Sequence, residues 1–166
     1  EIADEAVDAD SLREAVIIPL DAHTDLFAPE RAPDGEAISP ATRSDLLLVT
    51  AVPALRQLNC HIIEVKWRAN LSGFSESNAL RQEVARQLNE TEHTLRRHFD
   101  PHFAPVDRLD RSVKTKELMT LLGFYLDRAQ RYGLVGQETG SELRAFFQSL
   151  DAGYRLVFSG SGLFFD

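Results

Sequence analysis

A carboxylate and an amine, Glu64 and Lys66, lie two residues apart in the otherwise apolar segment CHIIEVKWRAN, residues 60–70. In a β-strand, side chains two residues apart project from the same side. Burying both charges is unfavourable unless they pair with each other or with a further partner such as a metal ion. The alternative is an edge strand, on which the two side chains form a water-exposed ion pair that contributes little to stability.

A second carboxylate, Asp45, lies at the start of the apolar segment SDLLLVTAV, residues 44–52. If this segment and the one that carries Glu64 form neighbouring strands, the two carboxylates converge. A divalent cation would relieve their repulsion, and one or two carboxylates completed by water are typical ligands of Mg²⁺. Lys66 beside such a site can position a water for attack on a phosphodiester and offset charge in the transition state.

Other polar residues give weaker indications of a site. Asp21, His23 and Asp25 follow the first apolar segment and either add to a metal site or form an ordinary polar turn. The other histidines do not have the spacing of zinc ligands, and the single cysteine, Cys60, leaves no cysteine pair. Eight basic side chains form either a phosphate-binding face or a solvated surface: Arg81, Arg86, Arg96, Arg97, Arg108, Arg111, Lys114 and Lys116.

The elements that must position these side chains follow from the hydrophobic pattern. Apolar runs predict three strands, periods of three to four residues predict three helices, and the C-terminal GYRLVFSGSGLFFD predicts a strand, a glycine-rich turn and a strand. The order β-β-β-α-α-α-β-β indicates an α+β or α/β fold, with a mixed β-sheet flanked by helices. The predicted strands cover 15–23, 44–52 and 59–69, and the predicted helices 77–99, 113–132 and 140–151.

Local signals mark the ends of these helices. Ser77 is the predicted N-cap of the first helix and Asp100-Pro101 its end. Gly133 ends the second helix, and Thr139 with Glu142 has the spacing of a capping box for the third.

One amide on the first helix is of interest for the site. Gln87 lies beside Val84 and Leu88 on or near the apolar stripe of that helix, which is unusual for an amide. It either assists the site or bonds to backbone or solvent. Gln82 is a second candidate.

The distribution of charge bears on possible partners. The net charge is −8, but residues 1–40 hold 11 acidic and 2 basic side chains, whereas residues 41–166 hold 15 acidic and 16 basic ones. The acidity is therefore confined to the N-terminal quarter, and the remainder can still carry a basic face for nucleic acid. No apolar run is long enough for a membrane span. One lone cysteine suits a reducing cytoplasm.

At Asp45, Glu64 and Lys66 the sequence resembles the PD-(D/E)xK nuclease superfamily, which has the restriction-endonuclease-like fold. The pattern is an acidic residue at the start of one strand, then an apolar strand with acid-x-Lys, then a helix with an inward glutamine. The resemblance implies a catalytic set of Asp45, Glu64, Lys66 and Gln87. It also implies Mg²⁺ or Mn²⁺ bound by Asp45 and Glu64, with Lys66 positioning the attacking water.

We therefore expect residues 1–166 to form a single nuclease-like domain, with an acidic segment over 1–14 and a core over about 15–166, excised from a larger protein. The expected function is metal-dependent cleavage of DNA within a restriction, phage-defence or DNA-processing system. Its partners would be DNA and other domains or subunits of a complex, and a homo-oligomer is left open. The alternatives are a nuclease-like module that binds DNA or assembles without catalysis, and an interaction domain in which the motif is accidental.

Overall fold

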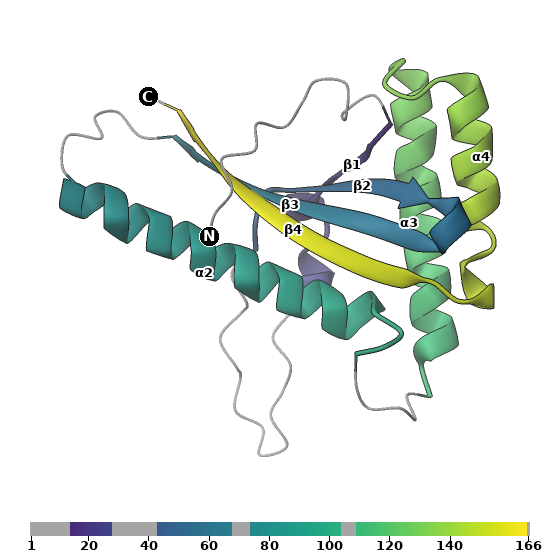
Figure 1. The fold of residues 1–166 in the computed structure, drawn as a ribbon, viewed down its shortest axis with the longest axis horizontal. Helices are drawn as coiled ribbons and strands as arrows, with labels where there is room; N and C mark the ends of the chain where they lie inside the picture. Colours follow the sequence, from purple (N-terminus) through teal and green to yellow (C-terminus); the bar gives the residue numbers. More distant parts are fainter. Residues whose placement is uncertain (1–13, 28–42, 68–73, 104–108, 166) are drawn as a thin grey trace.

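The computed structural model describes residues 14–27, 43–67, 74–103 and 109–165. Within these residues the chain forms a four-stranded mixed β-sheet and three α-helices, which confirms the predicted α+β fold (Figure 1). The expected acidic segment over 1–14 lies almost entirely outside this part. The strands are β1 (Val16–Pro19), β2 (Leu46–Val52), β3 (Gln57–Trp67) and β4 (Arg155–Phe165), and the helices are α2 (Phe74–Phe99), α3 (Arg111–Arg131) and α4 (Gln137–Phe147).

The sheet has the order β1-β2-β3-β4. The pairs β1–β2 and β2–β3 are antiparallel, whereas β4 runs parallel to β3. A short 3₁₀ turn, Pro53–Leu55, joins β2 to β3, and Arg56 follows it in the left-handed conformation with φ 48°. The Arg56 guanidinium donates to the backbone carbonyls of Ser149 and Gly153, so this hairpin is fastened to the connection between α4 and β4.

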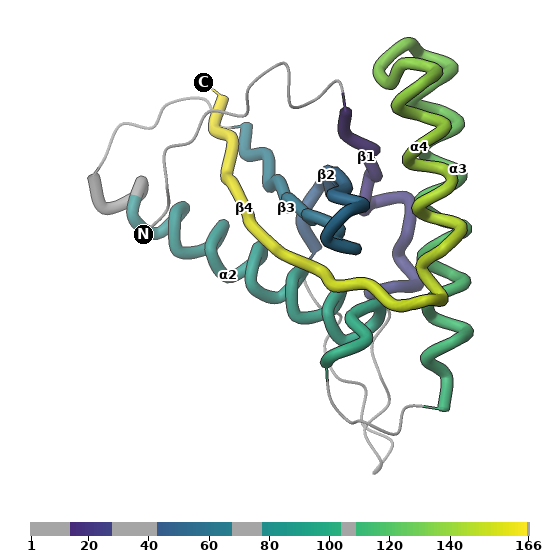
Figure 2. The backbone as a smooth tube through the Cα atoms, turned by 45° about the vertical axis from the view of Figure 1, so that its right-hand side comes forward, coloured from purple at the N-terminus to yellow at the C-terminus, as the bar shows by residue number. Residues whose placement is uncertain are grey.

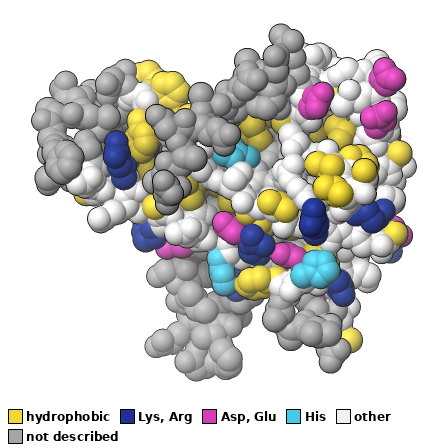
Figure 3. Space-filling model, in the orientation of Figure 1, with side chains coloured by type: hydrophobic (Ala, Val, Ile, Leu, Met, Phe, Trp, Pro, Cys, Tyr) yellow, Lys and Arg dark blue, Asp and Glu magenta, His cyan; other side chains and the backbone are white. Residues whose placement is uncertain are grey.

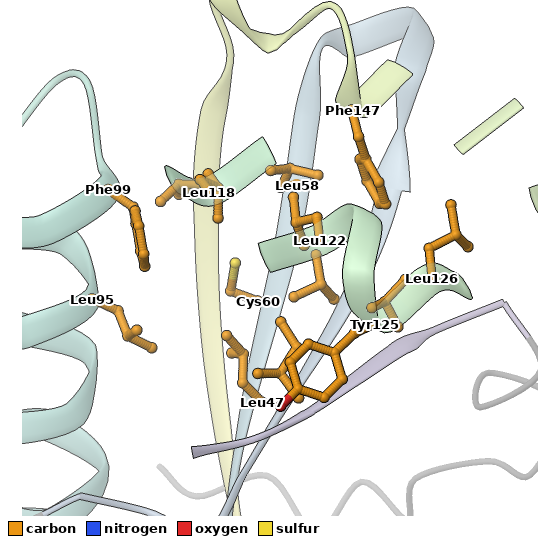
Figure 4. Close-up of a cluster of buried hydrophobic side chains, with 14 of the residues drawn as sticks. Leu47, Leu58, Cys60, Leu95, Phe99, Leu118, Leu122, Tyr125, Leu126 and Phe147 are labelled. Carbon is orange, nitrogen blue, oxygen red and sulfur yellow. The ribbon is translucent and has the colours of Figure 1, made fainter. Parts of the chain in front are cut away.

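Helices cover one face of the sheet, α2 along β3 and β4, and α3 beside β1 (Figures 1 and 2). Alternate side chains of the strands point into this layer. Figure 4 shows Leu58 and Cys60 of β3 next to Leu122 of α3, with Leu95 of α2 to one side. The other face holds a smaller buried cluster of Ala15, Leu48 and Ile63.

The predicted strand–turn–strand unit at the C-terminus is wrong, because β4 is one continuous strand of 11 residues. Its glycines serve packing rather than a turn. A Cβ on Gly162 would lie 2.8 Å from Val84 Cγ1, and a Cβ on Gly160 would lie 3.3 Å from Leu88 Cδ1. Glycine at these positions therefore allows α2 to approach the strand closely.

The helix ends agree with the sequence signals in part. Asp100-Pro101 ends α2, and Gly133, with φ +70°, follows α3. Ser77 is not the N-cap of α2, because the helix already begins at Phe74, and Thr139 lies inside α4, which begins at Gln137. Although α2 has 26 residues, no helix in the described ranges is long and apolar enough to cross a membrane.

Candidate active site

Strand alternation brings Glu64 and Lys66 to the helix-covered face of the sheet. Ile62, two residues before Glu64, lies in the main hydrophobic core, so the same side of β3 passes from apolar to charged side chains at its C-terminal end. The neighbouring strand adds no side chain beside Glu64, because its register partner in β4 is Gly162. Val84 of α2 packs against this glycine, so the helix covers the strand next to the carboxylate.

Asp45 precedes β2 and reaches the same end of β3. Leu46 pairs with Ile63, and the Asp45 N–H donates to the Ile63 carbonyl at 3.2 Å. The Asp45 Oδ2 atom accepts the Val65 N–H at 2.7 Å, which anchors this carboxylate against the backbone between Glu64 and Lys66. The sequence prediction that the two carboxylates converge is therefore confirmed in space.

The Glu64 side chain is only 3% exposed. Its Oε1 atom accepts the Lys66 Nζ at 2.9 Å, whereas its buried Oε2 atom has no hydrogen-bond partner among the described residues. Burial raises the pKa of Glu64, and the charge of Asp45 adds to the rise, while Lys66 opposes it. The Ser44 hydroxyl also lowers the pKa of Glu64. An unsatisfied buried oxygen with this charge environment favours a cation as its partner.

Lys66 is less deeply buried than Glu64, at 21% exposure. Desolvation lowers its pKa, but Glu64 and the more distant Glu83, 3.6 Å away, outweigh that effect and raise the pKa above its usual value. Lys66 is therefore a cation at neutral pH. The sequence alone also allowed a water-exposed ion pair of Glu64 and Lys66 on an edge strand. This alternative is wrong, because Glu64 is buried.

Gln87 lies on the side of α2 that faces this site. Glu83, four residues earlier, contacts Lys66, and Thr91, four residues later, hydrogen-bonds with Ser44. Side chains four residues apart share a helix face, so Gln87 lies between these two contacts. Its Oε1 atom is buried and, like the Oε2 atom of Glu64, has no hydrogen-bond partner within the described chain. Gln82 is exposed and does not share this position.

Three residues of this region were not recognised from the sequence as part of the site. Ser44 and Thr91 are fully buried and join the start of β2 to α2, with the Ser44 N–H donating to Thr91 Oγ1 at 2.8 Å. Glu83 is the second carboxylate near Lys66. Glu83 lies four residues before Gln87, so the sequence already placed both on one helix face. Which side of α2 faces the site became clear only from the structure.

The other candidates from the sequence do not join this group. Asp21 pairs with Arg43 at 2.8 Å, and His23 bonds to the Tyr125 hydroxyl at 2.8 Å, on the side of the sheet covered by α3. Asp25 is exposed in a 3₁₀ turn. A role for these three residues in metal binding stays a prediction.

The donor set suits a hard cation with few protein ligands. Asp45 and Glu64 supply carboxylate oxygens, and Gln87 has an unsatisfied amide oxygen nearby. Such oxygen ligands, completed by water, fit Mg²⁺ or Mn²⁺ better than zinc. Within the ranges that the structure describes, no group of three or more His, Cys, Asp or Glu side chains could hold a metal ion.

The basic surface predicted from the sequence is partly neutralised. Arg86 pairs with Glu90, Arg96 with Glu92 and Asp100, and Lys114 with Glu117. Arg108 lies outside the described residues. These pairs reduce the positive field that α2 and α3 present to a phosphate backbone, so the alternative of a solvated helix surface explains much of this charge.

Comparisons of the chain with family models, curated proteins and solved structures found no match.

Proposed function

We propose that this chain is a metal-dependent DNA endonuclease domain that hydrolyses phosphodiester bonds. The observation that carries the proposal is the buried Glu64 carboxylate, whose Oε1 atom pairs with Lys66 and whose Oε2 atom has no hydrogen bond among the described residues. Asp45 lies beside it, held by the Val65 N–H. Two carboxylates and one amine at one strand end are groups that metal-dependent hydrolysis of a phosphodiester uses.

Each residue has a distinct role in this proposal. Asp45 and Glu64 would hold Mg²⁺ or Mn²⁺, which, when bound, supplies Lewis-acid stabilisation of the phosphate oxygens. Lys66, a cation at neutral pH, orients the attacking water and offsets negative charge that develops on the phosphoryl group. Gln87 assists by presenting its amide toward this group of side chains.

The order of elements supports a restriction-endonuclease-like core. The acidic residue precedes β2, acid-x-Lys lies on β3, and the inward glutamine lies on the helix that follows, which is the pattern on which the resemblance to PD-(D/E)xK nucleases rests. Such a domain would act in the cytoplasm as one part of a restriction, phage-defence or DNA-processing system.

The test is a cleavage assay on supercoiled and linear DNA with Mg²⁺, Mn²⁺ or EDTA. We expect metal-dependent cleavage by the wild-type protein and a loss of at least about 100-fold, the lower end of the range for removing a stabilising or acid–base group, in Glu64→Gln, Lys66→Met and Asp45→Asn. Asparagine is chosen at position 45 because its side-chain oxygen can still accept the Val65 N–H. The matched control is Glu92→Gln, which removes a carboxylate of α2 that pairs with Arg96.

The outcomes separate the alternatives. Cleavage that persists in all three site variants would reject the assigned residues. DNA binding without cleavage in any metal would favour the catalytically inactive module. Equal loss in Glu92→Gln would show that the assay reports a general charge effect rather than this site.

A further inference from the structure

Two aromatic side chains form an exposed pair at the end of the sheet that holds the candidate site. Trp67, the last residue of β3, and Phe165, the last residue of β4, have ring centroids 5.9 Å apart and ring planes 19° apart, so they are stacked. Trp67 is 74% exposed and Phe165 is 46% exposed. Figure 3 shows hydrophobic side chains gathered over this end of the molecule, at the upper left.

Burial in the core does not explain this pair. Large aromatic side chains dominate core energetics when buried, but these two remain in solvent while their backbones are held by the parallel pairing of β3 and β4. Their register fixes them opposite each other. The structure therefore presents a flat aromatic surface at a defined position.

That position is next to the candidate site. Trp67 directly follows Lys66, so their Cα atoms are about 3.8 Å apart, and the two side chains project from opposite faces of the sheet. A nucleic-acid strand with its phosphate at Glu64 and Lys66 must change sides of the sheet to reach Trp67. A flexible single strand can make this turn, whereas duplex DNA, with a persistence length of about 50 nm, resists it.

We infer that Trp67 and Phe165 form a base-stacking platform, so that the substrate is single-stranded DNA or DNA with an unpaired strand beside the scissile phosphate. The inference rests on the proposed function for the position of that phosphate. Aromatic platforms bind unpaired bases in a sequence-tolerant way, because every base offers a π-face.

The surroundings of the pair suit a nucleotide. From Leu156 to Phe165, β4 carries no charged side chain, so no carboxylate on this strand repels a phosphate. Lys66, a cation, directly precedes Trp67 but projects from the opposite face of the sheet, where it lies at the candidate site. A second copy of the chain is the competing occupant, and the experiment includes it as an outcome.

The experiment uses Trp67 as its own reporter, because it is the only tryptophan in the chain. Its emission is followed in EDTA, where cleavage is not required, while a short thymidine oligonucleotide or a blunt duplex of equal length is added. Binding of labelled oligonucleotide is measured in parallel by fluorescence anisotropy. The variants are Trp67→Ala and Phe165→Ala, and the matched control is Phe124→Ala, which removes an aromatic ring of α3 that is 54% exposed.

We expect the single strand to quench Trp67 emission and the duplex to leave it unchanged. Trp67→Ala should weaken binding of the single strand by about 5- to 100-fold, and Phe165→Ala should weaken it in the same direction, whereas Phe124→Ala should bind as wild type does.

Several results would overturn the platform. They are binding without a change in emission, equal binding by Trp67→Ala, no binding of any oligonucleotide, and an emission change that follows protein concentration alone, which would indicate self-association. Because the titration needs no catalysis, quenching in a protein that never cleaves DNA would retain the platform and reject the hydrolytic function. Cleavage of DNA without quenching of Trp67 emission would retain the hydrolytic function and reject the platform.

Discussion

The Glu64 carboxylate is subject to two opposing effects. Its ion pair with Lys66 favours the charged form, whereas burial and the charge of Asp45 favour the neutral form. Burial is the larger effect, since Glu64 is 3% exposed, and the pKa is raised. The charged Glu64 carboxylate therefore reduces the stability of the fold, which is common where a side chain serves a functional site.

This balance predicts how stability depends on pH. A carboxyl whose pKa is raised in the folded state stabilises the fold fully below its ordinary value of about 4.5, and that contribution is lost as pH rises through the folded-state pKa. In EDTA, wild type should therefore lose free energy of unfolding relative to Glu64→Gln between pH 4 and the folded-state pKa, because glutamine does not titrate. Urea unfolding of both proteins at a series of pH values measures the difference.

The opposite trend would be equally informative. If wild type gains stability over Glu64→Gln as pH rises, the ion pair with Lys66 outweighs burial, and the Glu64 carboxylate is stabilised by the fold itself. The argument for a cation at its second oxygen would then lose its energetic basis.

The glycine-rich segment of β4 shows that the same residues are compatible with a turn and with a continuous strand. The stretch SGSG, residues 159–162, is typical of a turn, because glycine adopts turn conformations readily. In the structure Gly160 and Gly162 face α2 instead, and their missing side chains allow Val84 and Leu88 to pack directly on the strand. Packing of one helix thus decides the conformation of a glycine-rich segment.

A matched pair of substitutions tests this explanation. Gly162→Ala should reduce the free energy of unfolding by about 1–3 kcal/mol, because the new Cβ would lie 2.8 Å from the buried Val84. Gly123→Ala, within α3 and with open space around the new Cβ, should instead increase it by about 0.5–1 kcal/mol through helix propensity. Urea denaturation of both variants measures the two effects, and a destabilised Gly123→Ala together with an unaffected Gly162→Ala would contradict the packing argument.

One hydrophobic core joins segments from the whole described chain. It contains side chains of all four strands and of helices α2, α3 and α4, with Leu122 and Leu126 of α3 fully buried at its centre (Figure 4). Cys60 of β3 lies within it, and burial raises the pKa of this thiol to about 12. At pH 8 the thiol is therefore almost entirely un-ionised in the folded protein, so the group is protected from reagents that attack thiolates.

We therefore expect the described part of the chain to unfold as one unit. Leu122→Ala should lower the free energy of unfolding by about 2–5 kcal/mol, and the urea midpoints from circular dichroism and from the reaction of Cys60 with a thiol reagent should shift together. Thiol reactivity that appears at a lower urea concentration than the loss of helix would show that β3 separates from the helices first, and would contradict a single cooperative core.

The sequence by itself determined the local elements and the identity of the candidate site. Alternation and helical periodicity depend on neighbours within a few residues, so three of the strands and three of the helices were predictable to within a few residues. The set of Asp45, Glu64 and Lys66 was likewise readable, because a carboxylate and an amine in an apolar strand conflict with burial wherever they occur.

The tertiary structure alone decided what depends on distant contacts. The continuous β4 follows from close packing of α2 on Gly162. The place of Gln87 follows from the contacts of its neighbours on α2 with Lys66 of β3 and with Ser44 before β2. The stacking of Trp67 on Phe165 joins positions 98 residues apart. None of these contacts has a local signature, because burial and pairing are set by whichever side chains the fold brings together.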